Sequence, residues 1–244
     1  MPTHRINLWS SPRNISTALM YSFAQRPDTR VVDEPLYAHY LRHQPTAADH
    51  PGRDQILSSQ ENDGERVIAQ ILNGPYPSDA VVFKQMTHHL VAIDTDFLSA
   101  MKNVLLIRDP RAILASFSKV VDEVTAEDIG LPQQYALYQR LQASDALHAV
   151  VDSRRLLLDP AGQLRALCEA LDLPFYEAML QWEAGPRPED GVWATHWYDS
   201  VNASTGFGDP PGQSAEAIQL PPQLEQLADA VTAGYEELLS NSIL

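Results

Sequence analysis

The sequence predicts an α/β fold in which helices cover both faces of a parallel central sheet. Five short β-rich runs alternate along the 244 residues with segments of helical periodicity. Three of these runs are unbroken aliphatic stretches, which is typical of strands buried on both faces. Alternation of strands and helices predicts parallel strands joined by crossover helices. The length and the 44% hydrophobic content suit a single domain over residues 1–244.

The strands and helices of this pattern can be assigned to residues. The predicted strands are Arg5–Trp9, Arg30–Asp33, Ala80–Lys84, Asn103–Arg108 and His148–Asp152. The predicted helices are Ser16–Gln25, Glu65–Leu72, Pro110–Val120, Pro132–Leu147, Ala161–Leu171 and an amphipathic Leu220–Leu239. Pro110 and Pro132 stand in first helical turns, where proline is tolerated.

Two regions lack this regularity. His39–Gly64 is polar and contains prolines and a glycine, so we expect a long excursion or lid. Ala184–Pro222 is rich in Pro and Gly, and a loop of this length is usually functional or disordered. Its aromatic content argues against disorder and favours a flap over a site. The aromatic residues are Trp193, Trp197, Tyr198 and Phe207.

The charge balance restricts the partners that we expect. Lys and Arg number 17 against 32 Asp and Glu, which gives a formal charge of −15. A nucleic-acid-binding face is normally basic, so we expect no such partner. Any anionic ligand therefore needs a local cluster of basic residues.

Other bulk features indicate a cytoplasmic, soluble protein. The single cysteine, Cys168, lies in a helical pattern and is expected to be buried, so no internal disulfide forms. The N-terminal apolar run is too short for a signal peptide. No apolar stretch approaches the roughly 20 residues of a membrane span.

The loop after the first predicted strand has the layout of an anion site. A helix that begins near Ser16 would direct its free N–H groups at an anion, and Ser16 and Thr17 add hydroxyl donors. Arg13 adds a planar cation. The alternative is that Ser16 only caps the helix and Arg13 is a surface charge. Asn14 and Ile15 stand where an ATP-binding loop needs glycine, which indicates a shorter anion than a triphosphate.

A second basic motif follows the fourth predicted strand. Arg108 ends that strand, and Ser116 lies about two helical turns further on. The two side chains could hold one phosphate from two sides. The alternative is a local ion pair between Arg108 and Asp109, with Ser116 as a tolerated helical serine.

The segments "SPRNISTAL" and "IRDPRAILAS" together resemble the sulfotransferases that use 3′-phosphoadenosine-5′-phosphosulfate (PAPS). "HAVVDSRRLLLDPAGQLRALCEALDLPF" is similar to a further segment of that family. The resemblance implies a P-loop nucleoside-triphosphate-hydrolase-like three-layer sandwich. It also implies that Arg108 and Ser116 hold the 3′-phosphate of PAPS. The 5′ side would be held by the first loop, with Arg13, Asn14, Ile15, Ser16 and Thr17 as cofactor-binding positions.

The same resemblance implies that Arg13 stabilises charge on the leaving group and that a base deprotonates the acceptor. Glu34 lies in "VVDEPL", which looks like the "EPL" segment of carbohydrate-type and related bacterial sulfotransferases. The rival base is His88 in "FKQMTHHL", where Lys84 could contact the sulfonate. We place Glu34 slightly ahead of His88. Both segments have plainer interpretations, an acidic turn and locally packed histidines.

The acceptor side is expected to include His89, Trp197 and Tyr198, although Trp197 could equally be a core contact of a short helix. Adjacent histidines rarely converge on one ion, and sulfuryl transfer from PAPS requires no divalent cation, so we expect no metal. The resemblance implies that the acceptor is a small hydroxyl or amine compound. Exposed apolar residues in the final third could form a homodimer interface.

Two other functions are compatible with parts of this pattern. A P-loop nucleotide-dependent kinase would require magnesium and a Gly-Lys-Ser/Thr loop, and the sequence lacks that loop. A non-catalytic nucleotide-binding protein that retains the fold would bind 3′,5′-adenosine bisphosphate without turnover.

Overall fold

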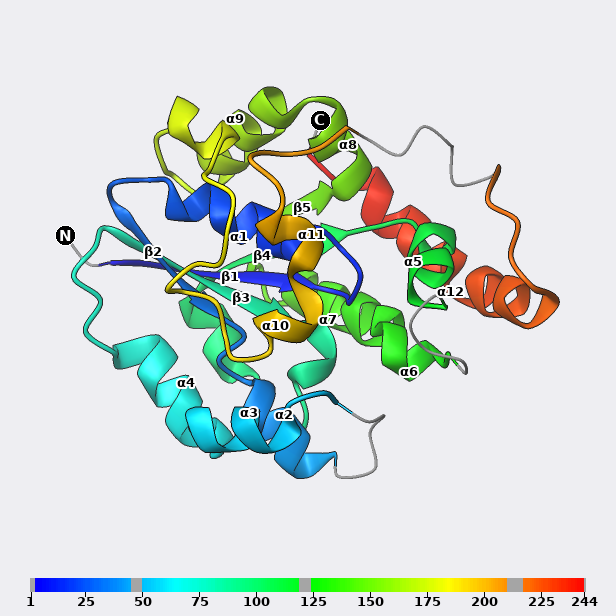
Figure 1. Ribbon diagram of the computed structural model, residues 1–244, viewed down its shortest axis with the longest axis horizontal. Helices are drawn as coiled ribbons and strands as arrows, with labels where there is room; N and C mark the ends of the chain where they lie inside the picture. The colour runs from blue at the N-terminus through cyan, green and yellow to red at the C-terminus, as the bar shows by residue number, and fades with distance from the viewer. Residues whose placement is uncertain (1–2, 45–49, 119–123, 210–216, 244) are drawn as a thin grey trace.

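A computed structural model describes residues 3–44, 50–118, 124–209 and 217–243 of the chain (Figure 1). Five parallel strands form one sheet in the order β2-β3-β1-β4-β5. The strands are β1 His4–Ser10, β2 Thr29–Asp33, β3 Ala80–Met86, β4 Lys102–Ile107 and β5 Leu147–Asp152. The parallel sheet and its five strands confirm the predicted fold class. Arg108 lies just past the end of β4 rather than inside it.

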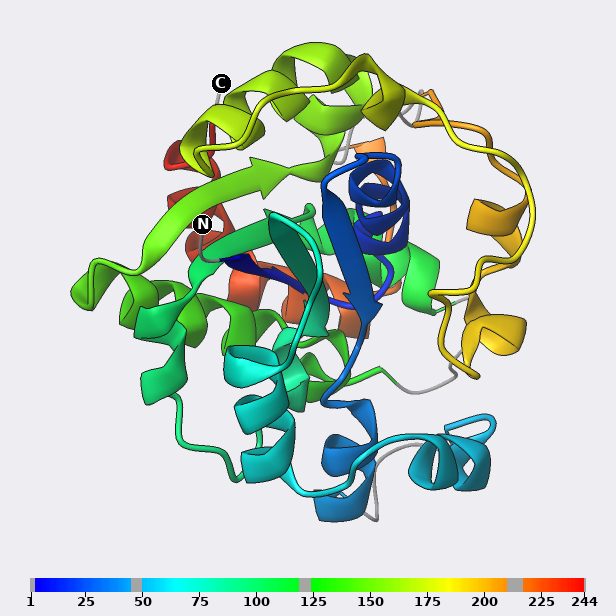
Figure 2. The same cartoon turned by 90° about the vertical axis from the view of Figure 1, so that its left-hand side faces the viewer.

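Helices cover both faces of the sheet (Figures 1 and 2). On one face α1, α8 and α9 pack on the sheet, and on the other α4, α7 and α12 do so. Successive residues of β3 show why the aliphatic runs are unbroken, since Val82 belongs to the first core and Val81 and Phe83 to the second. These helices are α1 Ser16–Ala24, α8 Ser153–Leu158, α9 Pro160–Ala170, α4 Gly64–Asn73, α7 Leu131–Ala143 and α12 Pro222–Ser240.

The remaining helices lie at the carboxyl ends of the strands or in the irregular regions. They are α2 Tyr37–His43, α3 Arg53–Ser59, α5 Pro110–Phe117, α6 Ala126–Ile129, α10 Ala194–Trp197 and α11 Asp199–Asn202. Short 3₁₀ helices lie at Thr87–His89, Asp96–Ala100 and Glu177–Leu180. No helix in the described ranges is long and apolar enough to cross a membrane.

The polar segment His39–Gly64 is more regular than its sequence predicts. It holds the end of α2 and all of α3, and its residues 45–49 lie outside the described residues. Ile56 of α3 is fully buried in a small apolar cluster with Leu41 and Trp193. A few apolar residues therefore suffice for α3, because they pack on a distant segment of the chain.

The predicted bounds of two helices were wrong. The helix expected at Pro132–Leu147 ends at Ala143, since Asp145 has a φ of 54° and turns the chain into β5. The helix expected at Pro110–Val120 ends at Phe117, and residues 119–120 lie outside the described part of the chain. The helix α8 was not predicted.

A buried amide joins β1, β4 and the turn before β5. Asn103 is fully buried, and its Nδ2 donates to the carbonyls of Leu98 at 2.8 Å and Ala146 at 3.1 Å. Its Oδ1 accepts from Asn7 Nδ2 at 3.0 Å and Trp9 Nε1 at 3.1 Å. Loss of this side chain leaves several buried polar groups without partners.

We therefore expect Asn103→Ala to lower the free energy of unfolding by about 3 kcal/mol or more, measured by urea denaturation. Asn73→Ala, at an exposed position near the end of α4, is the matched control and should change it by less than about 0.5 kcal/mol. Equal effects of the two substitutions would contradict this account.

Candidate functional site

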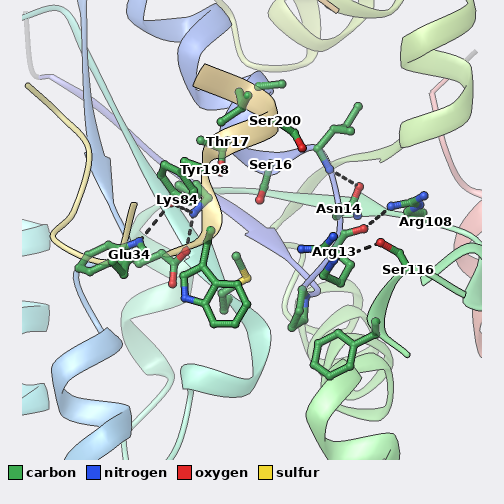
Figure 3. A pocket seen from close by; sticks show the side chains of 18 of the residues that line it. Arg13, Asn14, Ser16, Thr17, Glu34, Lys84, Arg108, Ser116, Tyr198 and Ser200 are labelled. Carbon is green, nitrogen blue, oxygen red and sulfur yellow. Dashed lines mark hydrogen bonds and ion pairs between the residues drawn. The ribbon is translucent and has the colours of Figure 1, made fainter. Parts of the chain in front are cut away.

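A cavity of about 490 Å³ opens where the parallel strands end (Figure 3). Its walls come from the loops after β1, β2, β3 and β4 and from the segment around α10 and α11. Carboxyl ends of parallel strands are the usual ligand site of such sheets. Every residue that the sequence proposes for catalysis, donor binding or acceptor binding lines this cavity. These residues are Arg13, Asn14, Ile15, Ser16, Thr17, Glu34, Lys84, His88, His89, Arg108, Ser116, Trp197 and Tyr198.

The loop after β1 makes its turn without glycine. Arg13 has a φ of 56°, a left-handed conformation that costs a non-glycine residue on the order of 1–3 kcal/mol. Asn14 Nδ2 donates to the carbonyl of Leu106 at 3.0 Å, and Asn14 Oδ1 accepts from the N–H of Ile15 at 2.8 Å. Asn14 thus shapes the loop, and the Ile15 amide is already paired within it.

The N-terminus of α1 is open toward the cavity. Its N-cap residue is Ile15, which makes no side-chain hydrogen bond, so Ser16 enters the first turn rather than capping it. By contrast, Asp109 caps α5 by accepting from the N–H of Arg111. Free N–H groups and the helix dipole favour an anion at such a terminus. Ser16 and Thr17 lie in this first turn and line the same wall.

Three predicted donor-binding residues meet at one end of the cavity (Figure 3). Arg13 Nε donates to Ser116 Oγ at 3.1 Å, and Arg108 Nη1 donates to the backbone carbonyl of Arg13. Burial and the Arg13 guanidinium lower the pKa of Arg108, which Asp109 partly offsets. The Arg13 side chain therefore lies beside Arg108 and Ser116, the two residues expected to hold the 3′-phosphate, although its loop is expected to hold the 5′ side. This end of the cavity suits a phosphate or sulfate group.

Lys84 lies at the other end and is fully buried. Sheet register pairs it with Asp33 on β2, so the two side chains share a face. Lys84 Nζ donates to Asp33 Oδ1 at 2.9 Å, to Glu34 Oε1 and to the Tyr198 hydroxyl at 2.8 Å. Burial alone would lower the pKa of Lys84, but Asp33 and Glu34 raise it well above its ordinary value. Lys84 is thus a permanently charged group in this site.

Glu34 follows β2 directly and turns into the cavity. Its φ of 39° is left-handed, and its N–H donates to the carbonyl of Lys84 at 2.9 Å. Burial raises the pKa of Glu34, although Lys84 opposes the shift. Lys84 binds Oε1, while Oε2 faces His89 Nδ1 at 4.0 Å. Glu34 therefore has one oxygen held and one oxygen turned toward the cavity.

Tyr198 belongs to this charged group. It is only 4% exposed, its hydroxyl donates to Asp33 at 2.8 Å, and Trp193 Nε1 donates to the same hydroxyl at 3.1 Å. Gly191 N–H also donates to Asp33 Oδ2 at 3.2 Å. The sequence placed Tyr198 on the acceptor side without this partner. It assigned Trp193 only to the flap over the site, and it gave Asp33 no role. The sequence feature that could have identified Asp33 as a site residue is its position beside Glu34 at the end of β2.

The two adjacent histidines have different surroundings. The ring of His89 stacks between Tyr37, with centroids 4.8 Å apart, and Tyr40, at 4.7 Å. His88 makes an edge contact with Tyr40. Burial lowers the pKa of His88 to about 3 and that of His89 well below its ordinary value. Both imidazoles are therefore neutral, and His88 is a weak base.

The described residues contain no group of three or more His, Cys, Asp or Glu side chains that could hold a metal ion. Cys168 is buried on α9, where burial raises the pKa of its thiol.

The chain belongs to the sulfotransferase domain family, which matches residues 4–223. Two Arabidopsis thaliana proteins are similar to it, the branched-chain-amino-acid aminotransferase-like proteins 1 and 2. Their identities are 44% over 209 residues and 42% over 206 residues, each over 84% of this chain. The chain spans only 37% and 36% of the length of these relatives.

Solved structures of sulfotransferases share the fold. The sulfotransferase domain from the curacin biosynthetic pathway has a TM-score of 0.57 at 18% identity, over 96% of this chain and 98% of that one. A mouse sulfotransferase complexed with PAP has a TM-score of 0.55 at 9% identity, over 99% and 86%. The predicted P-loop-like sandwich is confirmed.

The neutral histidines give a prediction for pH. Below about pH 6.5 the unfolded chain binds a proton at His88 that the folded chain excludes, because the folded pKa is lowered, so stability falls as the pH falls. We expect His88→Gln to flatten the decline in unfolding free energy between pH 6.5 and 4.5, by at most about 1.4 kcal/mol per pH unit. Urea denaturation at several pH values measures it. An unchanged slope would show that His88 is protonated in the folded protein.

Proposed function

We propose that this chain transfers a sulfuryl group from PAPS to a hydroxyl group of a small acceptor. The observation that carries the proposal is a pair of anion sites in one cavity. Arg13 and Arg108 lie at one end, and the open N-terminus of α1 lines the same cavity. A donor with a phosphate group on each side of an adenosine fits such a pair of sites. Membership of the sulfotransferase domain family supports the same chemistry.

The contacts suggest how the donor is divided between these groups. Arg108, Ser116 and Arg13 would bind the 3′-phosphate, since their side chains converge there. The 5′-phosphosulfate would lie at the first turn of α1, against Ser16 and Thr17. In the view of Figure 3, Ser16 lies between the Lys84 group and the Arg13 group. Charge on the leaving phosphate would be stabilised by the dipole and the free N–H groups of the first turn of α1.

Glu34 is the base in this proposal. As the acceptor oxygen bonds to sulfur, the proton of the acceptor hydroxyl passes to Glu34. The bond from sulfur to the 5′-phosphate oxygen breaks, and its electron pair stays on the phosphate. The raised pKa of Glu34 makes it a stronger base than an exposed carboxylate, whereas the lowered pKa of His88 makes that imidazole a poor one. Asp33 and Tyr198 hold Lys84 and so position Glu34.

The kinase alternative gains no support from the site, because the loop after β1 turns at Arg13 and offers no Gly-Lys-Ser/Thr motif. The aminotransferase names of the two plant relatives are not carried over, because the chain spans only about a third of those proteins.

Calorimetry with 3′,5′-adenosine bisphosphate, the product PAP, tests the donor. We expect PAP to bind without magnesium and more tightly than ATP with magnesium. Arg108→Ala should weaken PAP binding by about 30-fold, in line with loss of a charge-assisted contact of about 2 kcal/mol. Arg111→Ala is the matched control, because Arg111 in the same motif pairs with Glu225 on α12 and should leave the affinity unchanged. Binding of ATP with magnesium but not of PAP would overturn the donor assignment.

Glu34→Gln tests the base. It keeps an oxygen that accepts a hydrogen bond from Lys84, but the amide cannot take a proton, so we expect kcat/KM to fall by about 100-fold or more. PAP affinity should stay within about twofold. The assay is sulfuryl transfer to a panel of small alcohols, phenols and sugars, with exposed Glu65→Gln as the control. In the unsubstituted protein kcat/KM should rise with pH through a pKa above the usual carboxylate range. Full activity of Glu34→Gln would assign the base elsewhere.

A further inference from the structure

A gap of defined size separates Glu34 from His89. The distance from Glu34 Oε2 to His89 Nδ1 is 4.0 Å, which is too long for a hydrogen bond. His89 is only 1% exposed, and its Nδ1 has no hydrogen-bond partner in the structure. A buried polar atom without a partner carries a free-energy cost and calls for an explanation. A hydroxyl oxygen about 2.8 Å from each atom would bridge this gap.

Aromatic contacts fix the orientation of the His89 ring. Tyr37 and Tyr40 stack on its two faces, with interplanar angles of 19° and 24°. The Tyr37 hydroxyl is itself fixed at 2.8 Å from His50 Nδ1. A neutral imidazole carries one N–H, so His89 can donate to an acceptor oxygen while Glu34 accepts the proton of that oxygen.

Aromatic and apolar side chains form part of the wall of the same cavity. Tyr40, Met86, Trp197 and Val201 line it, and Trp197 is a large apolar side chain that is 38% exposed. These side chains favour an acceptor with a flat apolar body.

The charges near the gap disfavour an acceptor that carries an anionic group. Glu34 faces it, and Asp128 lines the same cavity. The Lys84 ammonium is already bound by Asp33 and Glu34. A carboxylate or phosphate on the acceptor would therefore meet like charge.

We infer that the acceptor is an alcohol or phenol with a flat apolar body and no anionic group, and that its hydroxyl binds between Glu34 Oε2 and His89 Nδ1. The inference rests on the proposed sulfotransferase function, because it names the acceptor of the same site. His89 is a substrate-binding residue in this account, and the proton still passes to Glu34.

Three probes test the acceptor class, with PAPS as donor. They are benzyl alcohol, 4-(hydroxymethyl)benzoate and xylose. We expect kcat/KM for benzyl alcohol to exceed each of the others by at least tenfold. Calorimetry should also show benzyl alcohol binding to the PAP complex of the full chain. An equal or better response to the carboxylate or the sugar would overturn the inference.

Two substitutions test separately the N–H group of His89 and the stacking of its ring. His89→Phe keeps the stack with Tyr37 and Tyr40 but removes the N–H, and it should weaken benzyl alcohol binding to the PAP complex at least tenfold. His89→Asn loses the stack but keeps an N–H near the Nδ1 position, and it should retain binding within about threefold. PAP affinity should be unchanged in both, which shows that they fold. Unchanged benzyl alcohol binding in His89→Phe would overturn the role of His89.

The same data distinguish failure of the proposed function from failure of the inference about the acceptor. Absence of PAP binding and of sulfuryl transfer to any probe would contradict the proposed function. PAP binding and transfer without preference for benzyl alcohol would contradict only this inference.

Discussion

The site depends on the burial of one ammonium group between two carboxylates. Lys84 is fully buried, and a charge in that position is tolerated only when it is paired and hydrogen-bonded. Asp33 and Glu34 supply the pair, and the Tyr198 hydroxyl supplies a further contact. These groups come from the ends of two strands and from the distant C-terminal segment. The ammonium therefore ties the edge of the sheet to the segment that covers the cavity.

This constraint explains the shape of the cover. Tyr198 and Trp193 meet at one hydroxyl, and Gly191 adds its N–H to Asp33, so the segment before α10 is bound to the end of β2. A second connection joins Tyr21 of α1 to Asp190 at 2.8 Å and Asn202 at 2.9 Å. Residues 190–202 of the segment rich in Pro and Gly thus have a defined path through polar contacts, although the segment has little periodicity, and residues 210–216 lie outside the described part of the chain.

The sequence was sufficient for the strands, the main helices and the lining of the cavity, because these follow from local patterns. Buried aliphatic runs specify strands, and the basic motifs follow the ends of β1 and β4. The sequence did not predict contacts between residues that lie far apart in the chain. Helix α3 depends on Ile56 packing near Trp193, and Arg13 reaches Ser116, which lies 103 residues away. Residue spacing placed Arg13 at the anion site but could not specify which end of the cavity its side chain faces.

At the opposite end of the cavity two positive charges lie together, although the net charge of the chain is negative. The formal charge is −15, yet Arg13 lies close enough to Arg108 that its guanidinium, together with burial, lowers the pKa of Arg108. Arg108 is also partly desolvated, and it is held by the carbonyl of Arg13, whose own φ is strained. An arrangement with two such costs contributes little to the stability of the empty protein. A bound dianion would offset both costs, because it neutralises the guanidiniums and fixes the loop. The strain at Arg13 is thus better explained by ligand binding than by folding.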